Sequence, residues 1–310
     1  IITYDLSILG AGVYNVTVVN PVTGERRDYA ITVTVAETIS ASDVTVTYGV
    51  SSKFTANFTD QYGVALANTN VTFKVGENTI NATTDVNGIA VFSIVFDAGN
   101  YNVTITNPVT CQVVTKSIAV KPLATKLSAS KLTMVYNTGK YLKATLKDAN
   151  GKALAKQKVY IKINGKTFER TTNTNGQVSL KITLPVKTYT ATITYKGTTN
   201  YVKSSASVKV VVKKASPKMT AKAKTLKTKT KKYTIVLKDN KGKAMKKVKV
   251  TLTTKVNGKK VKLTVKTKNN GKATFNLKKL VKGKYTAAVK FAGNKNFKAV
   301  TKKVKITVKK

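Results

Sequence analysis

The sequence contains no histidine and no tryptophan, and it has one cysteine among its 310 residues. Without histidine, no imidazole base can activate a serine or cysteine nucleophile, which excludes the commonest arrangements for covalent hydrolysis. Cys111 has no partner for an intramolecular disulfide, so each domain must be held together by its apolar core. Within residues 1–310 no apolar run approaches the roughly 20 residues that a membrane-spanning helix needs.

Acidic residues are also scarce, and arginine occurs only at positions 26, 27 and 170. The 56 basic and 12 acidic side chains give a net charge of +44 that is unevenly distributed. Residues 1–122 carry 6 basic and 9 acidic side chains, a net charge of −3. Residues 123–214 carry 18 and 2, a net of +16, and residues 215–310 carry 32 and 1, a net of +31. A gradient this steep indicates that the two ends meet different surroundings.

One motif recurs four times along the chain. A tyrosine that opens an alternating apolar run lies at Tyr14, Tyr101, Tyr189 and Tyr285, with steps of 87, 88 and 96 residues. This period is too long for a solenoid unit and matches a small independent domain. We therefore expect residues 1–36 to be the C-terminal part of an incomplete repeat, followed by three full domains at residues 37–122, 123–214 (basic) and 215–310 (strongly lysine-rich). Serial copies of one small module are typical of stalks and adhesive arrays rather than of enzymes.

Apolar and polar residues alternate with a period of two, which predicts β-strands with one buried and one solvated face. The fold class that follows is all-β, a tandem array of immunoglobulin-like β-sandwich domains. The alternation predicts a set of buried side chains: Val71, Phe73, Tyr101, Val159, Ile161, Tyr189, Val250, Leu252 and Tyr285. In residues 1–36 it predicts strands at 3–9, 14–19 and 29–35.

Turn signals support the same fold. Five Asn-Gly pairs supply the positive φ angles of two-residue hairpin turns and predict hairpins at Asn87-Gly88, Asn164-Gly165, Asn175-Gly176, Asn257-Gly258 and Asn270-Gly271. The repeated tyrosine fits either a tyrosine corner, in which its hydroxyl bonds to nearby backbone, or an ordinary core position. Linkers of a few residues at 36–38, 122–124 and 214–217 predict that neighbouring domains abut.

Several segments resemble a known family. Asp60-Gln-Tyr-Gly63-Val-Ala-Leu-Ala67, Val71-Thr-Phe73 and Thr84-Asp-Val-Asn-Gly88 resemble the bacterial and archaeal Ig-like repeats of invasin-type surface adhesins. Tyr195-Lys-Gly197-Thr-Thr-Asn200-Tyr201 and Phe291-Ala-Gly293-Asn-Lys-Asn296-Phe297 resemble a strand–turn step of related repeats. The Thr/Asn-rich early copies with a lysine-rich last copy are similar to adhesin-like proteins of methanogenic archaea. The resemblance implies a fold and a cell-surface setting, and it carries no binding residue.

Other polar residues are interpreted as structural. Asp60, Asp148 and Asp239 share one repeat position and predict side-chain-capped turns. A calcium loop at Asp85-Val-Asn87-Gly88 is disfavoured, since Asn173 and Lys268 replace the aspartate in later copies and calcium requires several carboxylates. We therefore expect no metal, cofactor or catalytic residue. Cys111, at the position of Gly24 in the preceding copy, is interpreted as a buried or half-buried structural cysteine within or at the entry of a strand.

Two signals remain. Five Asn-x-Thr triplets lie within residues 1–104 and are candidate N-glycosylation acceptors: Asn15, Asn57, Asn70, Asn81 and Asn102. The lysines of residues 215–310 repel one another, so this segment is expected where anions neutralise it. Candidate polyanion contacts are the lysines that alternate with apolar residues: Lys247, Lys249, Lys262, Lys266, Lys303 and Lys305.

These observations predict a non-enzymatic, adhesin-like stalk protein that is extracellular, at the cell surface or in the cell wall. Its cationic C-terminal domain is expected to attach to anionic cell-wall or surface polymers, while a host or neighbouring-cell surface would be met by parts outside residues 1–310. The alternative is a general polyanion-binding or nucleic-acid-binding protein. Against it stand the near absence of arginine and the inward phase of most aromatic residues in the last repeat. We therefore expect nucleic acid to bind only non-specifically.

Overall fold

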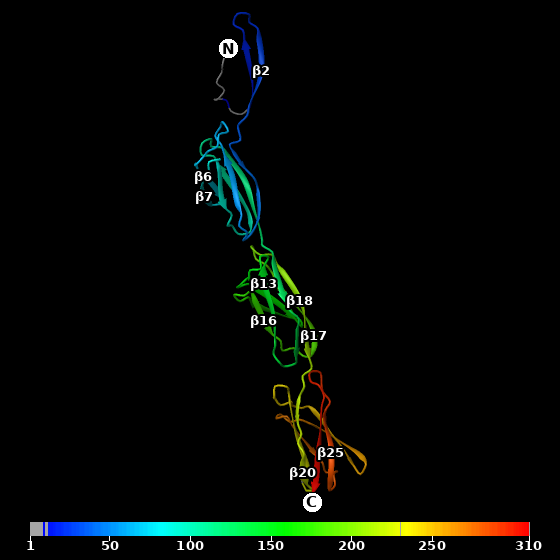
Figure 1. Ribbon diagram of the computed structural model, residues 1–310. Helices are drawn as coiled ribbons and strands as arrows, with labels where there is room; N and C mark the ends of the chain where they lie inside the picture. The colour runs from blue at the N-terminus through cyan, green and yellow to red at the C-terminus, as the bar shows by residue number, and fades with distance from the viewer. Residues whose placement is uncertain (1–8, 10–11, 230, 310) are drawn as a thin grey trace. The chain divides into compact units, whose positions relative to one another are not determined.

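The computed structural model describes residue 9, residues 12–229 and residues 231–309, and among these residues every regular element is a β-strand (Figure 1). The chain divides into two compact units, Ile1–Leu123 with Thr198–Val202, and Ala124–Gly197 with Lys203–Lys310. Threonine, valine and lysine in strict alternation cannot give a helix one apolar stripe, because the apolar period of two does not match 3.6 residues per turn. The predicted all-β class is confirmed.

The first strands form a two-stranded antiparallel ribbon. β1 (Gly12–Val19) and β2 (Arg26–Val33) pair over their full length, with Tyr14 opposite Ile31. These strands match the predictions at 14–19 and 29–35, with β2 beginning and ending a few residues earlier. The strand predicted at 3–9 falls outside the described residues except for Leu9, which has no regular structure.

Three sandwiches follow, each with a three-stranded and a five-stranded sheet. In the first repeat the sheet orders are β3-β5-β8 and β4-β10-β9-β6-β7. Its strands are β3 (Ile39–Ala41), β4 (Val44–Thr47), β5 (Lys53–Phe58), β6 (Asn70–Val75), β7 (Asn78–Thr83), β8 (Ile89–Ser93), β9 (Gly99–Thr106) and β10 (Val113–Lys121).

The second repeat has the same orders, β11-β13-β16 and β12-β18-β17-β14-β15. Its strands are β11 (Thr125–Ala129), β12 (Leu132–Val135), β13 (Tyr141–Asp148), β14 (Lys158–Ile163), β15 (Lys166–Thr171), β16 (Gln177–Lys181), β17 (Lys187–Tyr195) and β18 (Ser204–Lys213).

The third repeat has the orders β19-β21-β24 and β20-β26-β25-β22-β23. Its strands are β19 (Lys218–Thr220), β20 (Lys224–Lys227), β21 (Lys232–Lys238), β22 (Lys249–Val256), β23 (Lys259–Lys266), β24 (Lys272–Asn276), β25 (Gly283–Phe291) and β26 (Val300–Lys309).

The strand order identifies the immunoglobulin-like topology. In each repeat the opening segment splits, so that its first strand pairs antiparallel in the small sheet and its second pairs parallel with the last strand of the large sheet, as β4 does with β10. The remaining strand pairings are antiparallel, and the connections between strands cross from one sheet to the other in Greek-key fashion. That residues 37–122, 123–214 and 215–310 are three independent domains stays a prediction.

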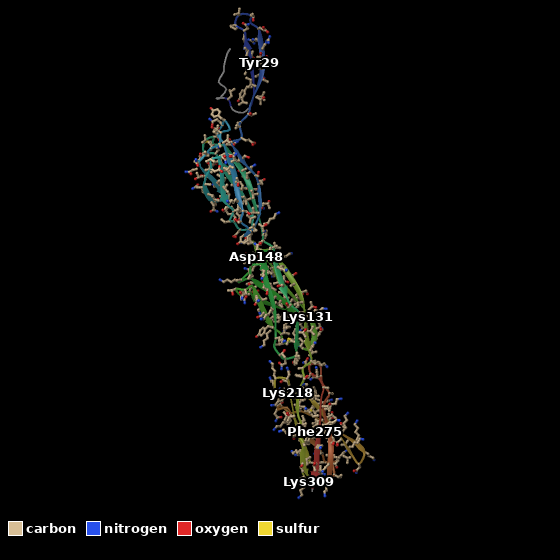
Figure 2. The ribbon with its side chains drawn as sticks, in the orientation of Figure 1. Tyr29, Lys131, Asp148, Lys218, Phe275 and Lys309 are labelled. Carbon is tan, nitrogen blue, oxygen red and sulfur yellow. The ribbon has the colours of Figure 1, made fainter. Side chains whose placement is uncertain are left out.

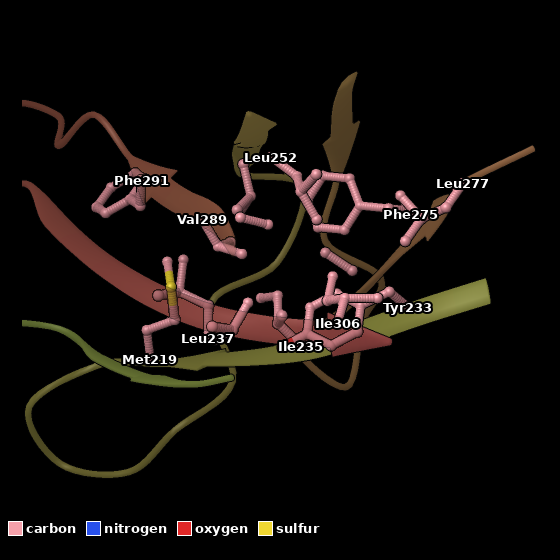
Figure 3. Packing of buried hydrophobic residues seen from close by; sticks show 14 of the residues in the cluster. Met219, Tyr233, Ile235, Leu237, Leu252, Phe275, Leu277, Val289, Phe291 and Ile306 are labelled. Carbon is pink, nitrogen blue, oxygen red and sulfur yellow. The ribbon is translucent and has the colours of Figure 1, made fainter. Parts of the chain in front are cut away.

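The inner faces of the two sheets form the cores. In the third repeat Tyr233, Ile235 and Leu237 of the small sheet pack against Leu252, Val289 and Ile306 of the large one (Figure 3). Of the nine side chains expected to be buried, seven are at most 8% exposed, whereas Tyr101 and Tyr285 are half-buried.

The repeated tyrosines at 101, 189 and 285 share one hydrogen bond. The Tyr101 hydroxyl donates to the Asp97 carbonyl at 2.9 Å, and Tyr189 and Tyr285 bond in the same way to Pro185 and Val281. Each hydroxyl thus reaches four residues back, to the loop before its own strand, where the sandwich ends. For these three tyrosines the tyrosine-corner interpretation is therefore the correct one of the two.

The Asn-Gly pairs divide into two kinds. Asn164-Gly165 and Asn257-Gly258 join paired strands, β14 to β15 and β22 to β23, with positive φ at both residues, as a type I′ hairpin requires. The hairpin prediction is wrong for Asn87-Gly88, Asn175-Gly176 and Asn270-Gly271. These pairs join strands of different sheets, since β7, β15 and β23 belong to the large sheets and β8, β16 and β24 to the small ones.

Candidate polyanion-binding surface

Five of the six candidate lysines lie at outward positions of one sheet. Lys249 is on β22, Lys262 and Lys266 are on β23, and Lys303 and Lys305 are on β26; all are exposed and alternate with buried or half-buried residues. The three strands belong to the five-stranded sheet of the third repeat. Figure 2 shows the side chains of this repeat, with Lys218 and Lys309 labelled.

Lys247 differs from its predicted place in the alternating run. β22 begins two residues later, and Lys247 lies in the preceding turn with φ 53°, in the left-handed region. Its N–H donates to the Thr267 carbonyl at 2.9 Å. Lys156 (φ 57°) and Asn68 (φ 49°) hold the equivalent turns before β14 and β6, so the turn conformation is a property of the repeat.

Among the described residues of the third repeat, no lysine forms an ion pair. The single acid, Asp239, is buried, and its carboxylate accepts the N–H groups of Lys241 and Lys243 at 2.9 and 2.8 Å. Asp60 and Asp148 cap their own turns identically, which confirms the predicted turn role. The other carboxylate oxygen accepts the Asn137 carboxamide at 3.1 Å, so Asp239 is occupied by uncharged donors and leaves the lysine ammonium groups without an internal counter-charge.

The second repeat neutralises part of its charge internally. Lys158 Nζ lies 3.1 Å from Glu169 Oε1, and Lys196 Nζ stands 4.6 Å from the centre of the Tyr160 ring. The hydrogen bond from Lys158 lowers the pKa of the Glu169 carboxyl, and the same contact raises the pKa of Lys158. Both groups are exposed, so the pair adds little to stability.

The first repeat has a different outer surface. All five candidate glycosylation acceptors are exposed, and they lie on β1 (Asn15), β5 (Asn57), β6 (Asn70), β7 (Asn81) and β9 (Asn102). The last three share the outer face of the five-stranded sheet, where Asn70 and Asn81 accept hydrogen bonds from Thr83 and Thr72 on the neighbouring strand. The face that carries lysine in the third repeat thus carries asparagine and threonine in the first.

The burial predicted for Cys111 is wrong, although the residue does lie at the entry of a strand. Cys111 is exposed and lies in the turn before β10, at φ 55°. The Asn107 carboxamide accepts the N–H groups of Val109 and Thr110, and the Asn107 carbonyl accepts that of Cys111 at 3.0 Å. This turn places Cys111 in the left-handed conformation that Gly24 (φ 70°) has in the preceding copy, away from the core.

Two asparagines that the sequence places only within turns make long-range hydrogen bonds. Asn200 Oδ1 accepts the N–H of Ala98 at 2.8 Å, and Asn296 Oδ1 accepts that of Val186 at 3.2 Å. In both cases the donor of the bond, Ala98 or Val186, lies just C-terminal to the residue whose carbonyl accepts the hydrogen bond of the corner tyrosine. The available signal was the recurrence of Asn followed by an aromatic residue after 96 residues, but this spacing does not identify the hydrogen-bond partner.

The described residues contain no cluster of three histidine, cysteine, aspartate or glutamate side chains that could hold a metal ion. In the same part of the chain, no helix has the length and apolar character needed to cross a membrane. Asp85 begins the segment that was considered as a calcium loop. Its carboxylate accepts the N–H groups of Asn87 and Ile89, both at 2.9 Å, and so caps its turn.

No protein-family model matches the chain, and no curated protein matches it. Among solved structures, it is similar to a tetra-tandem repeat in the extending region of a large adhesion protein, at 16% identity and a TM-score of 0.41, over 98% of this chain and 84% of that one. It is also similar to a tandem of titin domains, at 12% identity and a TM-score of 0.38, over 87% and 98%. A third similar structure is a Ca²⁺-stabilized adhesin that helps an Antarctic bacterium reach out and bind ice, at 14% identity and a TM-score of 0.31, over 98% and 83%. At these identities, function must be argued from the chain's own residues.

Proposed function

We propose that the chain is a non-enzymatic, adhesin-like stalk segment of a protein at the cell surface or in the cell wall, and that its third repeat attaches to anionic wall or surface polymers. The observation that carries the proposal is a change of outer surface on a constant fold. The same sheet face is lined by asparagine and threonine in the first repeat and by unneutralised lysine in the third. The two repeats share one strand order, so the difference between their outward residues is the feature to be explained.

The mechanism is Coulombic. Outward residues two apart on a strand stand about 7 Å from each other, which is less than the Debye length of about 8 Å at physiological ionic strength. A polyanion therefore meets a nearly continuous positive surface and releases its counterions on binding. Lysine is a strongly hydrated point charge without the planar fork of arginine, which suits diffuse attraction better than recognition of one defined group.

Nucleic acid as the dedicated ligand is the weaker alternative. Tyr233, Phe275 and Phe291 of the third repeat are at most 2% exposed, so they cannot stack with bases. Proteins that bind single strands without sequence preference rely on exposed aromatic platforms. The candidate glycosylation acceptors of the first repeats fit a surface location but do not bear on the ligand.

The test is a binding titration of the 310-residue chain with heparin and with purified acidic cell-wall polymer, at 50 and 200 mM NaCl. If six or more lysines contact the polymer, affinity should fall by about three powers of ten between these salt concentrations, as it does for basic proteins on DNA. Dextran, a neutral polymer, serves as control and should not bind. An affinity that does not change between the two salt concentrations, or a higher affinity for dextran than for the acidic polymers, would overturn the proposal.

A further inference from the structure

Both outer faces of the third repeat carry lysines, and the larger of the two carries more of them. The three-stranded sheet presents four of them, Lys218, Lys232, Lys238 and Lys272, at outward positions. The five-stranded sheet presents eleven, here called the lysine frame: Lys227 on β20, Lys303, Lys305 and Lys309 on β26, Lys284 and Lys290 on β25, Lys249 and Lys255 on β22, and Lys260, Lys262 and Lys266 on β23. The five-stranded sheet therefore offers the larger continuous array of outward lysines.

Within the lysine frame, like charges stand directly opposite each other. Lys249 pairs in register with Lys266, and Lys255 pairs with Lys260, across the β22–β23 ladder. Opposed side chains in an antiparallel pair have Cβ atoms about 5 Å apart, and like charges there destabilise the sheet. Since Asp239 is committed to its turn, neutralisation must come from an external anion.

The frame surrounds an uncharged floor. The middle of β25 presents Thr286 and Ala288 outward, and the middle of β22 presents Thr251 and Thr253, with Thr253 opposite Ala288. The lysines of β26 and β23 flank these two central strands at a separation of three strand spacings, about 14 Å. The floor is thus small, hydroxyl-bearing and wide enough for one extended polymer chain.

The corresponding faces of the other repeats lack this arrangement. In the second repeat the outward lysines are Lys158, Lys162, Lys209 and Lys213, and the first of them is paired with Glu169. In the first repeat Lys74 and Lys121 are the outward lysines of that face within the described residues. The frame therefore belongs to the third repeat and not to the fold.

We propose that the outer face of the β20-β26-β25-β22-β23 sheet is a binding site for a linear acidic polysaccharide, which lies over the threonine floor with its acidic groups on the lysine frame. This inference rests on the proposed function and assigns its site and ligand class. A sugar backbone offers hydroxyl groups that can bond to the floor threonines, and the face carries no exposed aromatic side chain on which a nucleobase could stack.

The site is tested with two matched variants of the full chain. The face variant combines Lys249→Gln, Lys262→Gln, Lys266→Gln and Lys303→Gln, and the control variant combines Lys218→Gln, Lys232→Gln, Lys238→Gln and Lys272→Gln. Both remove four charges. We expect the face variant to bind heparin at least about tenfold more weakly than the control and to lower the slope of log affinity against log salt by about 3–4, since each lost phosphate-type contact lowers it by about 1. Equal loss in both variants would overturn the site and leave the proposed function standing.

Folding is checked separately. The face variant removes the opposed pair Lys249–Lys266 and the control variant removes the opposed pair Lys218–Lys238, so the two variants should unfold at similar temperatures. A readout without mutation is lysine acetylation of the original chain with and without saturating heparin. Protection of Lys262 and Lys303 but not of Lys218 and Lys272 supports the site, and uniform protection overturns it. Failure of the original chain to bind any polyanion would overturn the proposed function itself.

The ligand class is tested with Thr253→Val and Thr286→Val together, which removes two floor hydroxyls and keeps side-chain shape and strand preference. We expect heparin binding to weaken severalfold with an unchanged salt slope, and binding of oligo(dT) of equal charge to stay the same. Tighter binding of oligo(dT) than of heparin at one ionic strength, or no effect of the two substitutions, would replace the polysaccharide with a less discriminating ligand.

Discussion

At the scale of single residues, the turn before β22 places a lysine in an unfavourable conformation. Lys247 has φ 53°, and a residue with a Cβ atom loses about 1–2 kcal/mol in the left-handed region, whereas glycine enters it freely. Because glycine is more flexible in the unfolded chain, we expect Lys247→Gly to stabilise the third repeat by a net ~0.5–1 kcal/mol. The measurement is urea unfolding, with the transition assigned by hydrogen exchange of β22.

Lys249→Gly is the matched control, since it removes one charge from the same segment. Lys249 lies in β22, where glycine lowers stability by roughly 0.5–1 kcal/mol. The two variants should therefore shift the unfolding midpoint in opposite directions. A shift in the same direction for both would mean that lost charge, and not backbone conformation, dominates.

Residues other than glycine in the left-handed region account for two predictions that were wrong, the strand position of Lys247 and the burial of Cys111. Lys247 and Cys111 both stand in apparently alternating runs, and both lie outside strands with positive φ. Composition cannot reveal this, because neither residue type favours the left-handed region. For Cys111 the alignment with Gly24 was the only hint, since a glycine in one copy can mark a conformation that the other copy also adopts.

At the scale of elements, the turns between sheets depend on close approach of two backbones. A Cβ atom on Gly176 would lie 2.3 Å from the Leu146 carbonyl oxygen, at a φ of 69°. We expect Gly176→Ala to destabilise the second repeat by at least ~2 kcal/mol, because the left-handed penalty adds to a steric clash that backbone cannot relieve cheaply. Chemical denaturation of the variant and the original chain measures the difference.

Gly165→Ala separates the two causes. Gly165 has φ 75°, but its added Cβ would meet no atom within 4 Å. This variant therefore pays only the conformational cost, roughly 1 kcal/mol. Equal destabilisation by both alanines would show that the approach of Gly176 to Leu146 is not a constraint.

Strands were predictable from the sequence, and their assignment to sheets was not. The alternation in β14 and β22 gives the buried face directly, because Val159, Ile161, Val250 and Leu252 repeat with the pleat. An Asn-Gly pair looks the same whether it closes a hairpin, as between β14 and β15, or passes to the other sheet, as between β15 and β16. That choice is made by contacts between residues far apart in sequence.

The buried polar residues were also not predictable from the sequence. Thr84, Thr172 and Thr267 are buried at one repeat position, and the latter two donate to the carbonyls of Leu154 and Met245 at 2.6 Å. Each of these hydroxyl groups thus pairs with a backbone carbonyl group in a segment that links two strands. Because the chain is rich in threonine, the residue type alone does not predict which threonines are buried. Only their shared position in the repeat distinguishes these three from exposed threonines.

At the scale of the whole molecule, the charge gradient was fully predictable, but its arrangement was not. Counting lysines gives the net of +31 for residues 215–310. The strand pairings then show that Lys249 faces Lys266 and that Lys255 faces Lys260, so part of this charge opposes folding. Stability of the third repeat should therefore depend on the ionic strength more than stability of the first.

This dependence is testable within one sample. Raising NaCl from 0.1 to 1 M shortens the Debye length from about 10 to 3 Å, which screens the lysine–lysine repulsion. We expect hydrogen-exchange protection of β22, β23 and β26 to increase, whereas that of β6 and β9 changes little, because residues 1–122 carry a net charge of only −3. The first repeat is thus the internal control for general salt effects on hydrophobic burial. An equal rise of protection in both repeats would show that repulsion between the lysines does not destabilise the third repeat. The physical reason to expect that an external anion stabilises this repeat would then be gone.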